Sequence, residues 1–307
     1  MNGGHAEIAL NLVWVLMAGF LVMFMQVGFA MVETGFTRAK NAVNTMAMNL
    51  IIYPIGVLGF WLVGYGLMQG GVVIWPSLGH RLVGAHEITL QIGGHALGLF
   101  GAARFALLTA PHDPANLTMF LFSAVFMDTA ATIPTGAMAE RWKFSAFIVY
   151  GLFMSMLLYP LYGNWVWGGG WLAAMGTNWG LGHGHVDFAG SSVVHMTGGL
   201  TALAGAIVLG PRLGRKFKRD GGQPMLPHDL TIAVTGGLIL WFGWYGFNPG
   251  STLSAMDFEG IGRVAANTTL AACAAGLTAM AYAYILSKKW DVSFTVNGFL
   301  AGLVAIT

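Results

Sequence analysis

Charged side chains are scarce in this chain of 307 residues. Asp, Glu, Lys and Arg together make up 8% of it, and its formal net charge is +2. Soluble domains carry about 25% charged residues, so this composition cannot cover a soluble surface. The small net charge excludes a nucleic-acid-binding protein, and the hydrophobic content of 56% excludes a disordered chain. With a mean hydropathy of +0.68, the composition indicates an integral membrane protein.

Cysteine is nearly absent as well. Cys273 is the single one, which excludes an internal disulfide and a thiolate metal cluster. Because Cys273 lies in an apolar stretch, we expect it to be an inert packing residue. Glycine and methionine are abundant by contrast, with 45 and 18 residues, and both suit helices that pack closely in lipid.

Long runs without Asp, Glu, Lys or Arg define the expected membrane spans. A spanning helix needs about 20 apolar residues. Seven spans reach this length, the third of them interrupted by Asp128, and an eighth is still apolar where the sequence ends, over residues 8–32, 46–69, 118–139, 144–165, 188–211, 230–256, 264–287 and 292–307. Period-two alternation is absent, which argues against a β-barrel. The first span is longer than a signal peptide and has no basic residue before it. We therefore expect an all-α polytopic membrane protein with a single domain over residues 1–307.

Lys and Arg are distributed unevenly between the two sides of these spans. Eleven fall on one side and three, Arg81, Arg104 and Arg263, on the other. Cytoplasmic loops carry the excess of Lys and Arg, so the N-terminus is predicted to lie outside and the basic loop 210–229 in the cytoplasm. Residues 70–116 then form a long outer loop. We interpret the basic loop as a topology signal. The alternative is that it also binds anionic lipid or a cytosolic partner.

Ionisable side chains within the spans are few, and each needs a reason to be there. Glu33 lies at the inner end of the first span, and we expect a structural pair with Arg38 or a cap at the membrane edge. His195 is the only ionisable residue of its span. A hydrogen bond between helices and a proton relay in a pore are both open for it. Its surroundings lack the spacing of a metal site. Asp187, eight residues earlier, is placed to cap the same helix, with direct contact to a ligand as the alternative.

Two glycine-containing stretches interrupt the apolar runs. They are Trp165-Val-Trp-Gly-Gly-Gly170 and Trp244-Tyr-Gly-Phe-Asn-Pro-Gly-Ser251. Proline and glycine here end the helices and leave backbone carbonyls unpaired. At membrane depth, broken backbone is tolerated only inside protein or beside water. The aromatic rings next to these breaks either hold a cation on their faces or are ordinary membrane-surface aromatics.

Several motifs in the same order carry a resemblance to a known family. They are Gly28-Phe-Ala-Met-Val-Glu-Thr-Gly-Phe-Thr-Arg-Ala-Lys-Asn-Ala-Val-Asn44, Gly136-Ala-Met-Ala-Glu-Arg141, Val166-Trp-Gly-Gly-Gly170, Asp187-Phe-Ala-Gly190 followed by Val-Val-His195, Gly246-Phe-Asn-Pro-Gly-Ser251 and the run from Asn297 to Thr307. With these motifs the chain resembles the ammonium transporter family (Amt/MEP/Rh) from its first span to its last residue.

The resemblance implies an eleven-helix fold with an outside N-terminus, of which this sequence holds about seven and a half helices. It further implies a homotrimer in the cell membrane with one pore in each subunit, ammonium as the transported ion, no cofactor, and a cytosolic PII-type regulator. The tail to which that regulator usually docks is not among these residues.

The resemblance also assigns roles to residues that match the family motifs. Trp167 and Ser251, with Phe126, correspond to the outer site that recruits ammonium. Phe126 and Phe247 correspond to two stacked rings that gate the pore. His195 corresponds to the first of two pore histidines, and Asp187 to the acid that holds the outer site together. No catalytic residue and no metal ligand is implied.

Three features depart from the family pattern. The second pore histidine lies in a later helix that this sequence does not contain, so we expect the chain to be C-terminally incomplete. Asp128 occupies a span position where the family has a small residue. We expect it to face away from the gate in a buried pair or a helix-packing hydrogen bond, with an added cation site as the alternative. The outer loop 175–186 is longer and carries His183 and His185, for which a solvated loop is the expectation and a pH-sensing or metal-binding role the alternative.

Two functions follow from these patterns, and a third is rejected. The leading hypothesis is a transporter or channel for ammonium. The alternative is a sensor built on the same fold, in which a signalling module follows the membrane domain and ammonium is bound without being conducted. A membrane enzyme is not expected, because neither a GxSxG nor an HExxH motif occurs.

Overall fold

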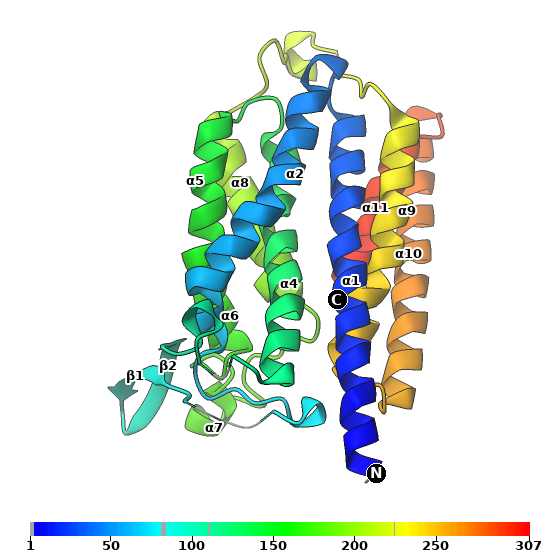
Figure 1. Cartoon of the computed structure of the whole chain (residues 1–307). Helices are drawn as coiled ribbons and strands as arrows, with labels where there is room; N and C mark the ends of the chain where they lie inside the picture. Colours follow the sequence, from blue (N-terminus) through cyan, green and yellow to red (C-terminus); the bar gives the residue numbers. More distant parts are fainter. Residues whose placement is uncertain (1–2, 81–83, 110, 224) are drawn as a thin grey trace.

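The structure, a computed structural model, is a bundle of long helices (Figure 1) and describes residues 3–80, 84–109, 111–223 and 225–307. Within this part of the chain, seven helical segments are long and apolar enough to cross a membrane, namely Gly4–Phe36, Ala39–Gln69, Pro114–Met138, Phe144–Val166, Ser191–Leu209, Leu230–Thr252 and Phe258–Ser287. An eighth apolar helix, Val292–Ala305, is shorter. This confirms the expected all-α membrane architecture, with seven full spans and a shorter eighth.

The helices and short turns of the bundle are as follows. The α-helices are α1 (Gly3–Phe36), α2 (Ala42–Gly59), α3 (Tyr65–Gln69), α4 (Pro114–Met138), α5 (Phe144–Phe153), α6 (Tyr159–Val166), α7 (Met175–Trp179), α8 (Thr197–Leu209), α9 (Leu230–Phe247), α10 (Phe258–Ser287) and α11 (Val292–Ala305). Short 3-10 turns cover Ala39–Asn41, Pro76–Leu78, Phe105–Leu107, Lys218–Asp220 and Pro249–Thr252. The two expected breaks are present, because α6 ends at Val166 and α9 ends at Phe247.

Three spans contain a π-helical turn rather than a continuous α-helix. Phe60–Gly64 joins α2 to α3, Met154–Leu158 joins α5 to α6, and Ser191–Met196 leads into α8. Single π-helical turns inside helices occur often at functional sites. The last of these turns carries His195, which places that side chain at an irregular point of the backbone.

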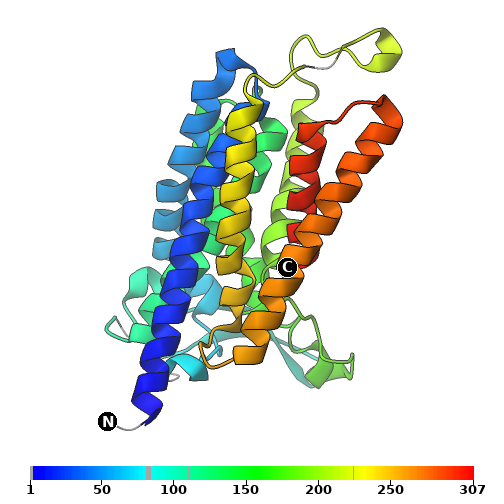
Figure 2. The ribbon, with the colours of Figure 1, turned by 90° about the vertical axis from the view of Figure 1, so that its right-hand side faces the viewer.

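Helices α1 and α9 pack side by side along much of their length, as Figures 1 and 2 both show. The contact depends on two facing glycines. A Cβ atom at Gly28 would lie 2.8 Å from the carbonyl oxygen of Gly236, and one at Gly236 would lie 2.7 Å from the carbonyl oxygen of Gly28. Small residues allow helix backbones to approach this closely in lipid, where dispersion contacts hold helices together.

The ends of α1, α4 and α8 meet around one buried carboxylate, at what we call the basic end of the bundle. Glu140, whose side chain is fully buried, forms an ion pair with Arg38 and lies 3.3 Å from Arg212. Burial raises the pKa of Glu140, but hydrogen bonds from Arg38 and the charges of Arg212 and Arg38 outweigh it and hold the pKa below its usual range. By the positive-inside rule this end is cytoplasmic.

The expected pairing of Glu33 with Arg38 is wrong. The Glu33 carboxylate accepts a hydrogen bond of 2.6 Å from Asn49 Nδ2, while Arg38 turns to Glu140. Arg38 lies beyond the end of α1 and reaches Glu140, the second residue after α4, whose carboxylate also lies close to Arg212. Nearness in sequence therefore misassigned a partner that is 102 residues away.

The long outer loop contains a feature that the sequence did not predict. Strands β1 (Glu87–Ile92) and β2 (His95–Gly101) form an antiparallel hairpin at the end of the bundle opposite the basic end. Its β2 strand is bonded to the end of α6 and to the loop that follows, because Trp165 Nε1 donates to Leu99 O (2.8 Å) and Trp171 N–H donates to Gly98 O (2.9 Å). Arg81, one of the three basic residues assigned to this side, lies outside the described residues.

The expectation that Cys273 is a packing residue is wrong. It is exposed on α10. Its apolar surroundings in the sequence reflect a helix with little of its surface buried in this chain, since 17% of the most apolar window of α10 is buried. An apolar stretch in a membrane protein does not distinguish a buried face from an exposed one.

Candidate functional site

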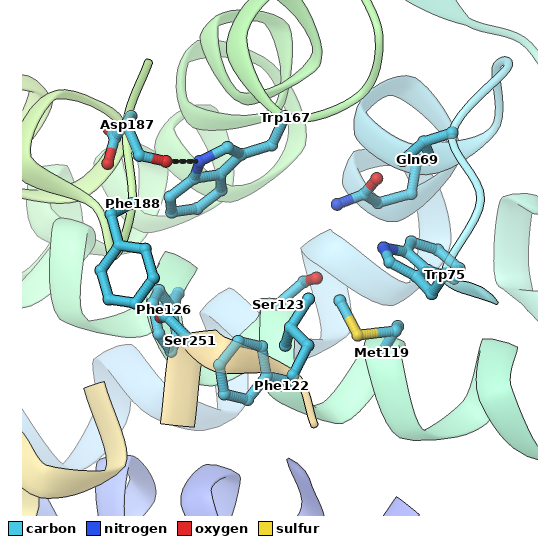
Figure 3. Close-up of a pocket in the computed structure, with 12 residues that line it drawn as sticks. Gln69, Trp75, Met119, Phe122, Ser123, Phe126, Trp167, Asp187, Phe188 and Ser251 are labelled. Carbon is cyan, nitrogen blue, oxygen red and sulfur yellow. Dashed lines mark hydrogen bonds between the residues drawn. The ribbon is translucent and has the colours of Figure 1, made fainter. Parts of the chain in front are cut away.

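A cavity of about 260 Å³ lies at the outer end of the bundle, among α3, α4 and the two broken-helix segments (Figure 3). We call it the outer vestibule. Its lining consists of Gln69, Val73, Trp75, Met119, Phe122, Ser123, Phe126, Trp167, Asp187, Phe188, Ser251 and Leu253. Phe126, Trp167, Asp187 and Ser251, which sequence reasoning singled out from four separate segments, therefore lie around one cavity.

Trp167 is held rigidly at the edge of this vestibule. It is the first residue after α6, and its backbone N–H donates to Gly163 O at 2.7 Å. The indole Nε1 donates to the backbone carbonyl of Asp187 at 2.7 Å (Figure 3). With its only polar atom satisfied, the indole presents ring surface to the cavity. The ring lies edge-on to Phe126, with the two centroids 6.0 Å apart.

Asp187 caps the start of the segment that carries His195. Its carboxylate accepts hydrogen bonds from the backbone N–H groups of residues 190, 191, 192 and 193, and from the hydroxyl of Ser192. These are the orphan donors that every helix start leaves. The segment that Asp187 caps begins with a π-helical turn at Ser191, not with an α-helix that starts near Asp187. Because these donors occupy its carboxylate, Asp187 supports the site through its backbone carbonyl and through the helix start.

Ser251 lies in the 3-10 turn that follows α9. Its hydroxyl donates to Phe247 O at 2.7 Å. A hydroxyl oxygen has two lone pairs in addition to its donor, so Ser251 Oγ can still accept a hydrogen bond from a ligand in the vestibule. The Asn-Pro-Gly-Ser sequence produces this geometry, because the proline cannot continue α9 and the chain turns back toward the cavity.

Two phenyl rings close the vestibule on the side toward the basic end. The centroids of Phe126 and Phe247 are 4.2 Å apart, and the ring planes are tilted by 40° instead of stacking in parallel. Phe126 and Phe247 are almost completely buried. Phe122, one helical turn before Phe126 on α4, adds a third ring at 4.5 Å. The vestibule thus ends at an aromatic barrier.

His195 lies behind this barrier. Its ring is stacked on Trp244 with centroids 5.1 Å apart and lies 5.7 Å from the ring of Phe247. His195 is buried, and its Nε2 atom has no hydrogen-bond partner within the described residues. A buried ring nitrogen without a partner is available to a ligand or to a proton.

Sequence reasoning missed one wall of the vestibule. Gln69, Trp75 and Ser123 face Trp167 and Ser251 across the cavity (Figure 3). Gln69 is the last residue of an apolar span, and Trp75 follows in the outer loop. Neither residue belongs to a motif that the sequence analysis recognised. Behind this wall lies Arg104, which is 1% exposed although it was expected among loop charges. Its guanidinium donates to Gln69 O (2.6 Å) and lies 5.3 Å from the Trp75 ring.

Among the described residues, Asp128 forms neither the buried pair nor the packing hydrogen bond that was expected. It is 2% exposed, and its Oδ1 atom has no partner in the part of the chain that the structure describes. Its electrostatic neighbours are Tyr53 on α2 and Tyr150 on α5. Asp128 is not among the residues that line the vestibule.

His183 and His185 differ from each other in the outer loop. His183 is exposed, as expected of a solvated loop. His185 is half-buried, and its Nε2 lies 2.9 Å from Ser192 Oγ, which also donates to Asp187. Among the described residues, no three His, Cys, Asp or Glu side chains come together as metal ligands. His185 is therefore an extension of the Asp187 hydrogen-bond network.

Comparison with known proteins agrees with this geometry. A family model described as Ammonium Transporter Family matches residues 13–307. The chain belongs to the ammonium transporter family. It is a multi-pass membrane protein.

Ammonium transporter Amt2 of Archaeoglobus fulgidus is 46% identical over 306 residues, which are 99% of this chain and 60% of that relative. Ammonium transporter 1 member 3 of Solanum lycopersicum is 35% identical, over 97% of this chain and 62% of the relative. The chain thus spans about three fifths of the length of these ammonium transporters.

Solved structures of the ammonium transporter family have the same fold. A protein described as a sensor Amt protein superimposes with a TM-score of 0.83 at 36% identity, over 98% of this chain and 69% of that one. Mep2 of Candida albicans gives a TM-score of 0.77 at 28% identity, over 97% of this chain and 60% of its own. Both similarities extend over nearly all of the present sequence.

Proposed function

We propose that this chain supplies the outer site, the gate and the first pore histidine of an ammonium transporter. In this proposal ammonium is collected in the vestibule between Trp167, Phe126 and Ser251. It passes the rings of Phe126 and Phe247 and gives up a proton with the help of His195. The single observation that carries the proposal is the order of these groups: an indole and a hydroxyl around one cavity, an aromatic pair below them, and a buried imidazole behind the pair.

The physical argument rests on the cost of removing water from a cation. A bare cation in an apolar passage loses a large solvation energy. Aromatic faces attract cations through their quadrupoles, and Ser251 Oγ can accept a hydrogen bond, so the vestibule replaces part of the lost hydration. Beyond the rings, a neutral imidazole can accept or pass on a proton. Potassium has no N–H group to donate and no proton to lose, so such a passage discriminates against it.

Family membership supports three further parts of the proposal. Ammonium transporters are the relatives that this chain matches, and the proposed activity is transport rather than enzymatic catalysis. We include a homotrimer in the cell membrane and a cytosolic PII-type regulator on the same ground.

A flux measurement tests the transport function. The protein is reconstituted in liposomes on a supported membrane, and an ammonium pulse is expected to give a current or flux. Trp167→Leu and Ser251→Leu should each weaken it strongly. Trp179→Leu is the matched control, because Trp179 lies at the same end of the molecule on α7 but does not line the vestibule. Equal losses in Trp167→Leu and Trp179→Leu would contradict the proposed outer site.

The role of His195 needs a separate readout. His195→Ala is expected to change proton-coupled uptake before it changes ammonium binding, because the imidazole lies behind the rings and not in the vestibule. Selectivity for ammonium over potassium should fall in the same variant. Unchanged selectivity with normal uptake would remove His195 from the proposal.

The second candidate function is an ammonium sensor. The observation that favours it is the similarity to the sensor Amt protein, at 36% identity and a TM-score of 0.83. A sensor binds ammonium in the same vestibule without conducting it. Saturable ammonium binding that Trp167→Leu weakens, together with no flux in either orientation, decides for the sensor. An ammonium flux that Trp167→Leu reduces decides for the transporter.

A further inference from the structure

A second cavity lies at the basic end, far from the outer vestibule. Its volume is about 560 Å³, and three half-buried arginines, Arg141, Arg212 and Arg215, line it together with Gly210 and Phe217. Arg141 follows α4, and the other two belong to the loop after α8. We call this cavity the arginine pocket. The proposed transport function makes no use of it.

Two of the arginines that line the pocket, Arg141 and Arg215, are held in place by hydrogen bonds to backbone carbonyls. Arg141 donates through Nη1 to Gly210 O and through Nη2 to Ala137 O, while its Nε atom is buried and has no partner in the described part of the chain. Arg215 Nη1 donates to Gln223 O at 2.9 Å, and its guanidinium lies 5.9 Å from the Phe217 ring centre.

Among the described residues, acids balance the positive charges of the pocket only in part. Glu140 is the acid next to it, and it is shared between Arg38 and Arg212. Arg141 and Arg215 form no salt bridge among the described residues. Burial lowers the pKa of Arg141, and the like charge of Arg212 lowers it further. Two guanidinium groups that repel each other in a half-buried cavity are relieved by an anion bound between them.

We propose that the arginine pocket binds a phosphate group. Guanidinium groups match phosphate oxygens in pairs, because the planar N–H groups of arginine donate two parallel hydrogen bonds to them. Arg212 and Arg215 each have one terminal nitrogen engaged by the protein and retain further N–H donors on their guanidinium groups. Carboxylates share part of this chemistry, but three converging arginines favour an anion that can carry two charges and several acceptor oxygens.

Two sources of such a phosphate group reach this position. The basic end is cytoplasmic by the positive-inside rule, so a soluble phosphate compound can enter the pocket directly. Ile207 and Val208 at the end of α8 are 72% and 83% exposed, so lipid acyl chains can lie next to the pocket while an anionic headgroup enters it. The shared chemistry is the phosphate group, and the two sources are separated by experiment.

The chain offers a matched pair of variants. Arg215→Gln removes a charge that lines the pocket. Arg219→Gln removes the same charge from the same loop, and Arg219 also lies over Phe217, at 5.6 Å, but its side chain is 82% exposed and does not line the pocket. An unchanged thermal melting curve in both variants shows that the fold is retained.

The test has one arm for each source. In the soluble arm, inorganic phosphate and pyrophosphate are titrated calorimetrically into the purified protein. In the lipid arm, native mass spectrometry counts phosphatidylglycerol retained by protein taken from vesicles of phosphatidylcholine with phosphatidylglycerol. Saturable binding in either arm that Arg215→Gln weakens by about tenfold, and Arg219→Gln leaves unchanged, supports the proposal and identifies the source. Absence of binding in both arms overturns it, and so does an equal loss in the two variants, which would show diffuse charge attraction.

Discussion

The carboxylate of Glu87 lies 3.4 Å from the side-chain nitrogen of Asn164 and joins the outer hairpin to the segment that carries Trp167. Glu87 begins β1, and Asn164 lies in α6 three residues before Trp167. The backbone carbonyl of Asn164 accepts the N–H groups of Gly168 (3.0 Å) and Gly170 (2.9 Å), so the same residue holds the turn after Trp167. Two acceptors in this contact, Glu87 Oε1 and Asn164 Oδ1, are buried without a donor in the described residues.

The first prediction concerns the pH dependence of this contact. Burial raises the pKa of Glu87 from 4.5 to about 7. A carboxyl whose pKa is higher in the docked state favours docking fully below pH 4.5 and loses that contribution as pH rises to about 7. A protonated Glu87 can donate to Asn164 Oδ1, whereas the carboxylate cannot. We expect hydrogen exchange in β1 and β2, corrected for intrinsic rates, to increase between these pH values, with a loss of about 1–2 kcal/mol after allowance for partial exposure.

Glu87→Gln provides the control for that experiment. Glutamine has a side-chain donor at every pH and has no charge to desolvate. Hydrogen exchange in the hairpin of Glu87→Gln should therefore stay slow across the same range. A pH response in Glu87→Gln equal to that of the unmodified protein would show that another group titrates.

The second prediction concerns the buried acid at the basic end. Glu140→Ala removes the common partner of Arg38 and Arg212, and it leaves two guanidinium groups close to each other. The free energy of unfolding should fall by about 3 kcal/mol, because breaking a buried pair leaves uncompensated charge. Glu259→Ala is the control: the Glu259–Arg263 pair is exposed on α10, and exposed pairs contribute little. Unfolding in mixed micelles measures both, and equal effects would contradict the central position of Glu140.

The third prediction concerns the contact of α1 with α9. Gly236→Ala places a Cβ atom 2.6 Å from Val32 N and 2.7 Å from Gly28 O, two backbone atoms of α1 that cannot move aside without displacing the helix. The cost of such overpacking is about 1–3 kcal/mol. Gly199→Ala in α8 meets nothing within 4 Å and should leave the melting temperature unchanged or slightly raised. If the two variants melt at the same temperature, the close approach of the two backbones does not contribute to stability.

The fourth prediction applies one chemical change to two aspartates. Asp128→Asn removes a buried carboxylate whose Oδ1 has no partner, so the protein should gain about 1 kcal/mol in stability. Asp187→Asn replaces a carboxylate that accepts four backbone N–H groups and one hydroxyl. It should lose about 1–2 kcal/mol. Thermal unfolding of the two purified variants decides. Loss of stability in Asp128→Asn would mean that the Asp128 carboxylate has a stabilising role that its contacts do not show.

Much of the fold follows from the sequence for one physical reason. The thickness of the hydrocarbon core fixes the length of a spanning helix, so runs without charges mark the helices, and Pro249 and the glycines near Trp167 mark the breaks. Membership of the ammonium transporter family was predicted from ordered motifs and is confirmed by the family match over residues 13–307. The motif residues Trp167, Ser251 and Phe126 surround one cavity, while their roles in ammonium recruitment and gating stay predictions.

The remaining features depend on tertiary contacts that no local pattern records. Arg38 pairs with Glu140, which a second arginine also approaches, while the Glu33 carboxylate is bonded to Asn49. Gln69 and Trp75 entered the vestibule because the outer loop folds back on Arg104. The orientation of Cys273 depends on which face of α10 the neighbouring helices cover, and in a membrane helix both faces are apolar.

The anchoring of α4 at both ends restricts how the passage can open. Asp113 caps its first turn, with Ala115 N–H donating to Oδ1 at 3.0 Å, and Tyr65 Oη donates to Asn116 O at 3.0 Å. At the opposite end Glu140 ties the chain after α4 to two loops. These attachments hold α4 against sliding along its axis, so in the proposed gate we expect Phe126 to move by rotation of its side chain rather than by displacement of its helix. Rotamer changes of this kind are faster than rearrangements of whole helices.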